Sequence, residues 1–157
     1  IVTMDAWEPF RVNGPEQSPE PLPYLQQKGA KAFDINLEVA IQPENEVETV
    51  VSRSNFKYMY WSMAQQLAHH TINGCRVNSG DMMGSGTISG PTEDSFGSML
   101  ELSWGGQKPL KMNGGSERKF INDNDTVIIR GYCQKDNLRI GFGEVSSKLL
   151  PAVDLKF

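Results

Sequence analysis

Apolar and polar residues alternate along residues 33–42, and this is the clearest pattern in the chain. The apolar positions are Phe33, Ile35, Leu37, Val39 and Ile41. A period of two is typical of a strand that buries one face, so this segment predicts a strand. Pro43 ends it because proline has no backbone N–H for the ladder. After a short acidic turn, residues 49–51 predict a partner strand.

The period changes to three and four between residues 55 and 73. The apolar stripe consists of Phe56, Met59, Tyr60, Met63, Ala64, Leu67 and His70. Such spacing places side chains on one face of a helix. Ser54 or Asn55 can cap its start, and Asn73-Gly74 supplies a left-handed stop. The pattern therefore predicts one long buried helix over residues 55–73.

Short strands separated by glycine and turn residues dominate the rest of the chain. They are predicted at residues 82–89, 98–104, 126–133 and 139–145. Prolines between residues 7 and 25 predict an extended arm over residues 1–30, which we interpret as a surface connection rather than a ligand for a proline-binding partner. One domain over residues 1–157 follows, with a β-rich body over residues 31–157. The predicted class is mainly β, a β-roll or sandwich with a single helix, rather than a doubly wound sheet.

Composition and charge narrow the function classes. The chain has 157 residues, of which 38% are hydrophobic and 22% charged, as in one globular domain. A net charge of −4 gives no basic footprint for nucleic acid. No apolar run reaches the roughly 20 residues of a membrane helix and no leader is visible, so we expect no membrane partner and a cytoplasmic location. Cys75 and Cys133 form no disulfide framework, and both are expected to be buried.

The glycine-rich segment of residues 84–90 is the first candidate for chemistry. It lacks the Gly-Lys-Ser/Thr sequence of a phosphate loop, so a strand entering a turn is favoured. Such a turn can still present Thr87 to a small ligand. Ser85 and Ser89 stand in no Gly-x-Ser-x-Gly elbow, which disfavours a serine hydrolase.

The histidines and one glutamate complete the candidates. His69 and His70 diverge by about 100° on a helix and cannot share a metal, and His70 is expected as a hydrogen-bonded core residue. Alternation over residues 98–104 places Glu101 on one strand face with Met99 and Ser103. If both faces are covered, this carboxylate is buried and must be paired; if one face is wet, it is a solvated strand residue. The pattern leaves both interpretations open.

Two long runs of residues are distinctive, NFKYMYWSMAQQLAHH (residues 55–70) and SFGSMLELSW (residues 95–104). Shorter runs are residues 21–25, 33–37, 72–75, 80–81, 85–91, 118–120, 127–129, 131–134 and 139–143. In this order, these runs resemble the fumarylacetoacetase family. The resemblance extends over nearly the whole chain but covers only the C-terminal portion of the family. It implies that the β-roll or sandwich is part of a larger catalytic domain and that an N-terminal portion of the same polypeptide is missing.

The resemblance also implies an activity. Members of the family are homodimeric hydrolases that split fumarylacetoacetate into fumarate and acetoacetate, the last step of tyrosine and phenylalanine degradation. A histidine takes a proton from water, and a divalent cation, Ca²⁺ or Mg²⁺, holds the diketone oxygens and stabilises the departing carbanion. The alternatives are a related acylpyruvate-type hydrolase and a non-catalytic dimerisation or binding piece.

Only two of the family's functional residues match positions in this chain. Thr87 corresponds to a residue that contacts the small-molecule substrate, and Glu101 corresponds to a carboxylate that pairs with the catalytic histidine. The metal-binding acidic residues, the catalytic histidine and the active-site arginine and lysine of the family lie upstream of Ile1. His69 and His70 stay structural in this interpretation, and the chain alone is expected to be inactive.

Overall fold

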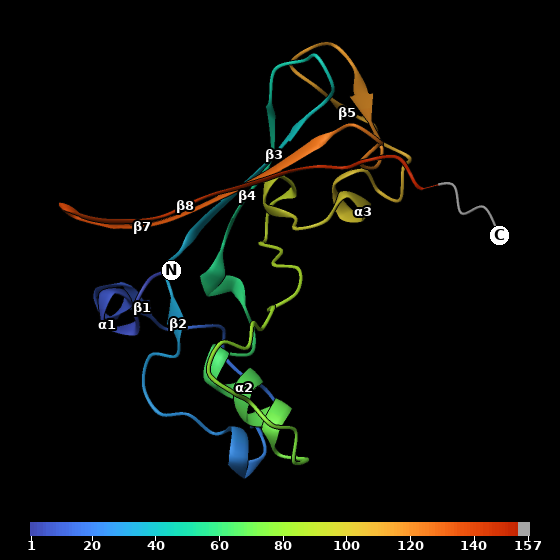
Figure 1. Cartoon of the computed structure of the whole chain (residues 1–157). Helices are drawn as coiled ribbons and strands as arrows, with labels where there is room; N and C mark the ends of the chain where they lie inside the picture. The colour runs from blue at the N-terminus through green and yellow to red at the C-terminus, as the bar shows by residue number, and fades with distance from the viewer. Residues whose placement is uncertain (154–157) are drawn as a thin grey trace.

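A four-stranded antiparallel sheet organises the chain in a computed structural model that describes residues 1–153. It is built from β3 (Asn36–Gln42), β4 (Thr49–Asn55), β7 (Thr126–Lys135) and β8 (Leu138–Lys148). The strand order is β4-β3-β7-β8, so β3 lies between its own hairpin partner and a strand from the far end of the chain. Figure 1 shows β7 and β8 as a long paired ribbon. The predicted mainly β class is confirmed.

The strand predicted over residues 33–42 is divided in two. Ala32–Phe33 form β2, which pairs with β1 (Arg11–Val12), and the main sheet strand begins only at Asn36. The interruption falls at Asp34, whose carboxylate accepts a hydrogen bond of 2.6 Å from the Asn55 side chain. The Asp34 N–H donates to the Phe10 carbonyl and the Ile35 carbonyl accepts from the Phe56 N–H, so the chain passes from one pairing to the next over these two residues. The partner strand predicted at residues 49–51 is confirmed within β4.

The arm predicted over residues 1–30 is not simply extended. It contains α1 (Met4–Trp7) and two 3-10 turns, η1 (Glu8–Phe10) and η2 (Pro23–Leu25), besides β1. Pro9 and Pro23 stand in the first positions of these turns, where a missing N–H costs no hydrogen bond. Phe10 joins Phe33, Ile35 and Cys133 in the hydrophobic core cluster, so the arm supplies part of the core.

The long buried helix predicted over residues 55–73 is wrong in length and in burial. The structure has a 3-10 turn, η3 (Phe56–Tyr58), a non-helical link, and then α2 (Met63–Thr71) of nine residues. Ser62 starts α2 through a capping box with Gln65, in which each side chain bonds the other residue's backbone N–H. Gln65 is the buried residue of α2, whereas Leu67 and His70 of the predicted apolar stripe are exposed.

Two predicted strands are absent from the described residues, and two are longer than predicted. Residues 82–89 have no regular structure, and residues 98–104 contain α3 (Met99–Leu102) instead of a strand. The predictions at residues 126–133 and 139–145 are confirmed as β7 and β8. The remaining elements are η4 (Glu93–Ser95) and the small hairpin of β5 (Leu110–Lys111) and β6 (Glu117–Arg118).

The two cysteines differ in their surroundings. Cys133 is fully buried in the core, as predicted, and burial raises the pKa of its thiol. Cys75 is exposed after α2, so its predicted burial is wrong. Among residues 1–153, no helix combines the length and the apolar character that a crossing of the bilayer requires.

Candidate functional site

Glu101 lies in the first turn of α3, not on a strand. Ser98 is the N-cap, and its hydroxyl accepts a hydrogen bond of 3.3 Å from the Glu101 backbone N–H. The same hydroxyl donates to Glu101 Oε2 at 2.7 Å. A serine followed three residues later by a glutamate is the sequence signature of a capping box, so this helix start could have been found from the sequence.

The Glu101 carboxylate is held by hydroxyl groups. Ser89 Oγ lies 2.8 Å from both Oε1 and Oε2, so its single proton can bridge them. Hydrogen bonds from the Ser98 hydroxyl and then the Ser89 hydroxyl lower the pKa of Glu101 against the opposing effect of burial, and the N–H groups of Ser98 and Gly97 lower it further. The side chain is half-buried and ionised. This lies between the buried, paired carboxylate and the solvated residue that the sequence left open.

The segment that carries Thr87 is attached to the chain just before α3. Ser89 Oγ accepts a hydrogen bond of 3.0 Å from the Gly97 N–H, and the Gly90 N–H donates to the Ser95 carbonyl at 2.8 Å. The Ser52 hydroxyl of β4 in turn donates to the Phe96 carbonyl at 2.7 Å, which ties the region to the sheet. Thr87 itself is exposed, and its hydroxyl enters no hydrogen bond among the described residues.

The structure thus brings the neighbourhoods of Thr87 and Glu101 together through Ser89. In the sequence, Ser89 is only a disfavoured candidate nucleophile, and its pattern gives no reason to connect it with Glu101. No signal in the sequence reports this connection, because it depends on how an irregular segment folds back onto α3.

The histidines do not join this cluster. His69 and His70 are exposed on α2, so the expectation of a core position for His70 is wrong. His69 Nδ1 is 3.0 Å from the Tyr24 hydroxyl, and the two rings stack with centroids 6.4 Å apart. Within residues 1–153, no three or more His, Cys, Asp or Glu side chains gather in a way that could hold a metal ion.

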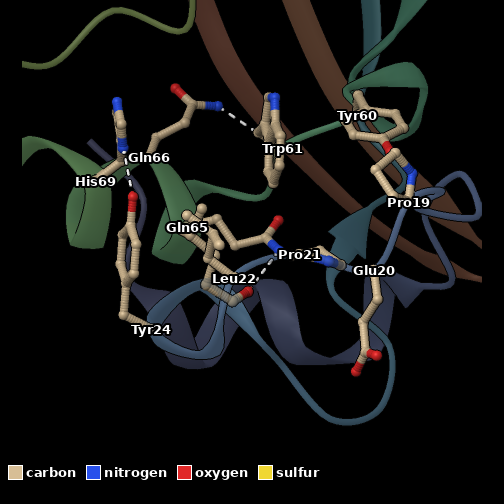
Figure 2. A pocket seen from close by; sticks show the side chains of 11 residues that line it. Pro19, Glu20, Pro21, Leu22, Tyr24, Tyr60, Trp61, Gln65, Gln66 and His69 are labelled. Carbon is tan, nitrogen blue, oxygen red and sulfur yellow. Dashed lines mark hydrogen bonds between the residues drawn. The ribbon is translucent and has the colours of Figure 1, made fainter.

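A cavity of about 520 Å³ lies elsewhere, between the proline-rich arm and α2. Figure 2 shows Tyr24 pointing to His69 on one side of it and Tyr60 beside Pro19 on the other. Its lining is mainly apolar, and neither Thr87 nor Glu101 contributes to it. The cavity and the Glu101 cluster are therefore separate features.

Comparisons with known proteins place the chain in a family. The family model described as "Fumarylacetoacetate (FAA) hydrolase C-terminal" matches residues 1–149. The chain is 54% identical to fumarylacetoacetase from Homo sapiens over 154 residues, which are 98% of this chain and 37% of that protein. It is 53% identical to the Dictyostelium discoideum protein of that name and 48% identical to the one from Arabidopsis thaliana. In each case the aligned region covers 97% of this chain and 36% of the relative.

These matches agree with the family resemblance found in the sequence. The chain spans about 37% of the length of the human relative. Because the family model matches almost all of its residues, the chain belongs to the fumarylacetoacetate hydrolase family, in the region that the C-terminal family model describes.

Proposed function

We propose that this chain is part of a fumarylacetoacetase, which hydrolyses the carbon–carbon bond of fumarylacetoacetate to give fumarate and acetoacetate at the end of tyrosine and phenylalanine degradation. The observation that carries the proposal is identity of 48–54% over nearly the whole chain to an animal, an amoebal and a plant protein of that name. The activity is that of the whole relatives, of which the chain corresponds to 37% or less in these three cases.

In this proposal, Glu101 orients a histidine that takes a proton from water. An ionised carboxylate has about four acceptor positions, and the Ser89 and Ser98 hydroxyls leave part of this capacity free. Its negative charge would stabilise the protonated form of an imidazole placed beside it, as in a triad. The described residues offer no histidine bonded to Glu101, and we propose that this imidazole comes from residues outside this chain.

Thr87 is proposed to contact the substrate. Its side chain is exposed in the segment of residues 84–90, which hydrogen bonds of Ser89 and Gly90 attach to the rest of the chain. A free hydroxyl there can donate to a carboxylate or ketone oxygen, both of which fumarylacetoacetate has. Loss of this donor would weaken substrate binding.

The described residues do not fit the divalent cation that the family resemblance implies. Ca²⁺ and Mg²⁺ require several oxygen ligands, and residues 1–153 contain no such cluster. We propose that the ligands of this cation lie outside this chain.

Two further parts of the proposal concern assembly and location. The complete enzyme is proposed to be a homodimer, as the family resemblance implies. A cytoplasmic location is supported by two free thiols, because free cysteines persist in a reducing compartment.

The test is an assay of fumarylacetoacetate hydrolysis in the presence of a divalent cation. We expect turnover in a complete polypeptide that carries these residues and none above background in the 157-residue chain alone. Glu101→Gln in the complete polypeptide should lower turnover by about tenfold to a thousandfold, because the base is misoriented.

A matched control is Glu93→Gln, which removes an exposed carboxylate in the neighbouring turn η4 and should leave turnover unchanged. Near-normal turnover of Glu101→Gln would return Glu101 to a structural role. Faster hydrolysis of an acylpyruvate than of fumarylacetoacetate by the unmodified enzyme would reject the proposed substrate.

A further inference from the structure

One hydroxyl joins the two proposed site residues. Ser89 Oγ lies 2.8 Å from each oxygen of Glu101 and accepts the Gly97 N–H at 3.0 Å. Among the described residues, the contacts of Ser89 with Glu101 are the only hydrogen bonds between the segment of residues 84–90 and α3, and Gly97 lies just before that helix. Since Thr87 is two residues from Ser89, their Cα atoms lie within about 7 Å of each other.

Glycine at position 97 allows the segment to lie close to the start of α3. A Cβ atom there would be 2.7 Å from Thr87 Cγ2 and 2.6 Å from the Ile88 carbonyl oxygen. Both distances are shorter than real contacts of a Cβ atom, and the second involves backbone, which cannot rotate away. The backbone of Gly97 therefore packs directly against Thr87, and any larger residue would displace it.

The fold of α3 does not need the Ser89 hydroxyl. Ser98 already caps the helix by accepting the Glu101 N–H, and Ser98 also donates to the carboxylate. The additional bond from Ser89 fixes the second carboxylate oxygen, Oε1, which Ser98 does not reach. Its effect is on the position of the carboxylate rather than on the start of the helix.

We propose that Ser89 is a positioning residue that fixes the Glu101 carboxylate and the Thr87 hydroxyl relative to each other, and that Gly97 provides the close packing on which this depends. The inference rests on the proposed function, in which Glu101 orients the base and Thr87 contacts the substrate. Ser89 acts on turnover through Glu101, whereas Gly97 acts on substrate binding through Thr87.

The experiment measures kcat and KM for fumarylacetoacetate in the complete polypeptide. Ser89→Ala should lower kcat by about tenfold to a hundredfold, because small displacements of catalytic groups are costly. Ser89→Thr keeps the hydroxyl and should restore most of the loss. The control is Ser85→Ala, whose hydroxyl bonds only the Gly86 carbonyl at 3.2 Å and whose loss should leave both constants unchanged.

A double variant separates positioning from general damage. If Ser89 acts through Glu101, then Ser89→Ala should lower kcat little further in a Glu101→Gln background, because groups that act as a unit are not additive. A full additional loss in that background, or normal kcat in the single Ser89→Ala variant while Glu101→Gln is impaired, would overturn the inference. Normal turnover of Glu101→Gln would instead reject the role of Glu101 in the proposed function.

Gly97→Ala tests the packing part. It should raise KM by severalfold while the unfolding midpoint stays near that of the unmodified protein, because the displaced residues are exposed or half-buried at the surface. Unchanged KM would show that Thr87 does not depend on the close approach of Gly97. A large fall in the unfolding midpoint would show that Gly97 serves the fold instead.

Discussion

At the scale of single residues, Asp125 is the most completely buried charged group of residues 1–153, with 1% of its surface exposed. Arg118 donates to both of its carboxylate oxygens at 2.8 Å, and the Asn122 N–H donates at 2.9 Å. Burial raises the pKa of Asp125, but the bonds from Arg118 and Asn122 outweigh it, and the pKa is lowered. The ion pair thus fixes the turn of residues 122–125 to β6.

Removal of the arginine should destabilise the fold. Arg118→Ala leaves the Asp125 carboxylate buried without its cation, which typically costs about 3 kcal/mol or more in the free energy of unfolding. Arg53→Ala is the control, because Arg53 is largely exposed and its contact with Glu38 is 3.3 Å long. Urea unfolding of both variants checks the prediction, and similar losses of less than about 1 kcal/mol would contradict it.

At the scale of elements, the strands of the main sheet were more predictable from the sequence than the helices. Alternation of apolar and polar residues predicted β3, and the glycine and turn residues that separate the later segments marked β7 and β8. Alternation over residues 98–104 misled because α3 is a single short turn, for which a seven-residue window fits both periods. The starts of α2 and α3 depend on hydrogen bonds of Ser62 and Ser98, and for these two helices the capping signature is the more reliable signal.

The candidate site was less predictable than the fold. Family resemblance pointed to Thr87 and Glu101, but the sequence pattern around these two residues predicted no role for either. Ser89 and Glu101 are twelve residues apart in the sequence, and the geometry of their contact depends on Gly97 and on the attachment of Phe96 to β4. Such contacts follow no period, so they emerge only from the three-dimensional structure.

The cap of α2 provides a test at this scale. Ser62→Ala removes the acceptor of the Gln65 N–H and the donor of a 2.6 Å bond to the Gln27 side chain, and should lower the free energy of unfolding by about 1 kcal/mol. Ser79→Ala is the control, since Ser79 is exposed in a turn outside the helix. Equal stability of the two variants in chemical unfolding would show that the cap does not fix the start of α2.

At the scale of the whole molecule, the chain has a small core and a large exposed apolar surface. Phe10, Phe33, Ile35 and Cys133 form the buried cluster, whereas side chains such as Trp61, Met82 and Val145 are exposed. The stability of the chain therefore depends strongly on its few buried groups, among them the Arg118–Asp125 pair.

This dependence gives stability a pH profile. Because the pKa of Asp125 is lower in the folded chain than its ordinary value near 3.9, the folded state binds protons less readily than the unfolded state. The contribution of Asp125 to the free energy of unfolding is complete above its pKa in the unfolded chain. It is lost as the pH falls through its lower pKa in the folded chain. Urea titrations between about pH 6 and pH 3 should show a smaller loss of stability in Asp125→Asn than in the unmodified chain. Parallel profiles would assign acid unfolding to other groups.

The strand order β4-β3-β7-β8 also has a consequence for biosynthesis. A side-chain bond from Asn36 to the Tyr132 carbonyl joins positions 96 residues apart. Every residue of β3 pairs with a residue of β7 over a similarly long separation in the sequence. The ribosome must therefore synthesise the chain as far as β7 before β3 can pair with its second neighbour. Completion of the sheet thus follows formation of the β3–β4 hairpin on the nascent polypeptide. Until then, the β3–β4 hairpin has an open edge that molecular chaperones can shield.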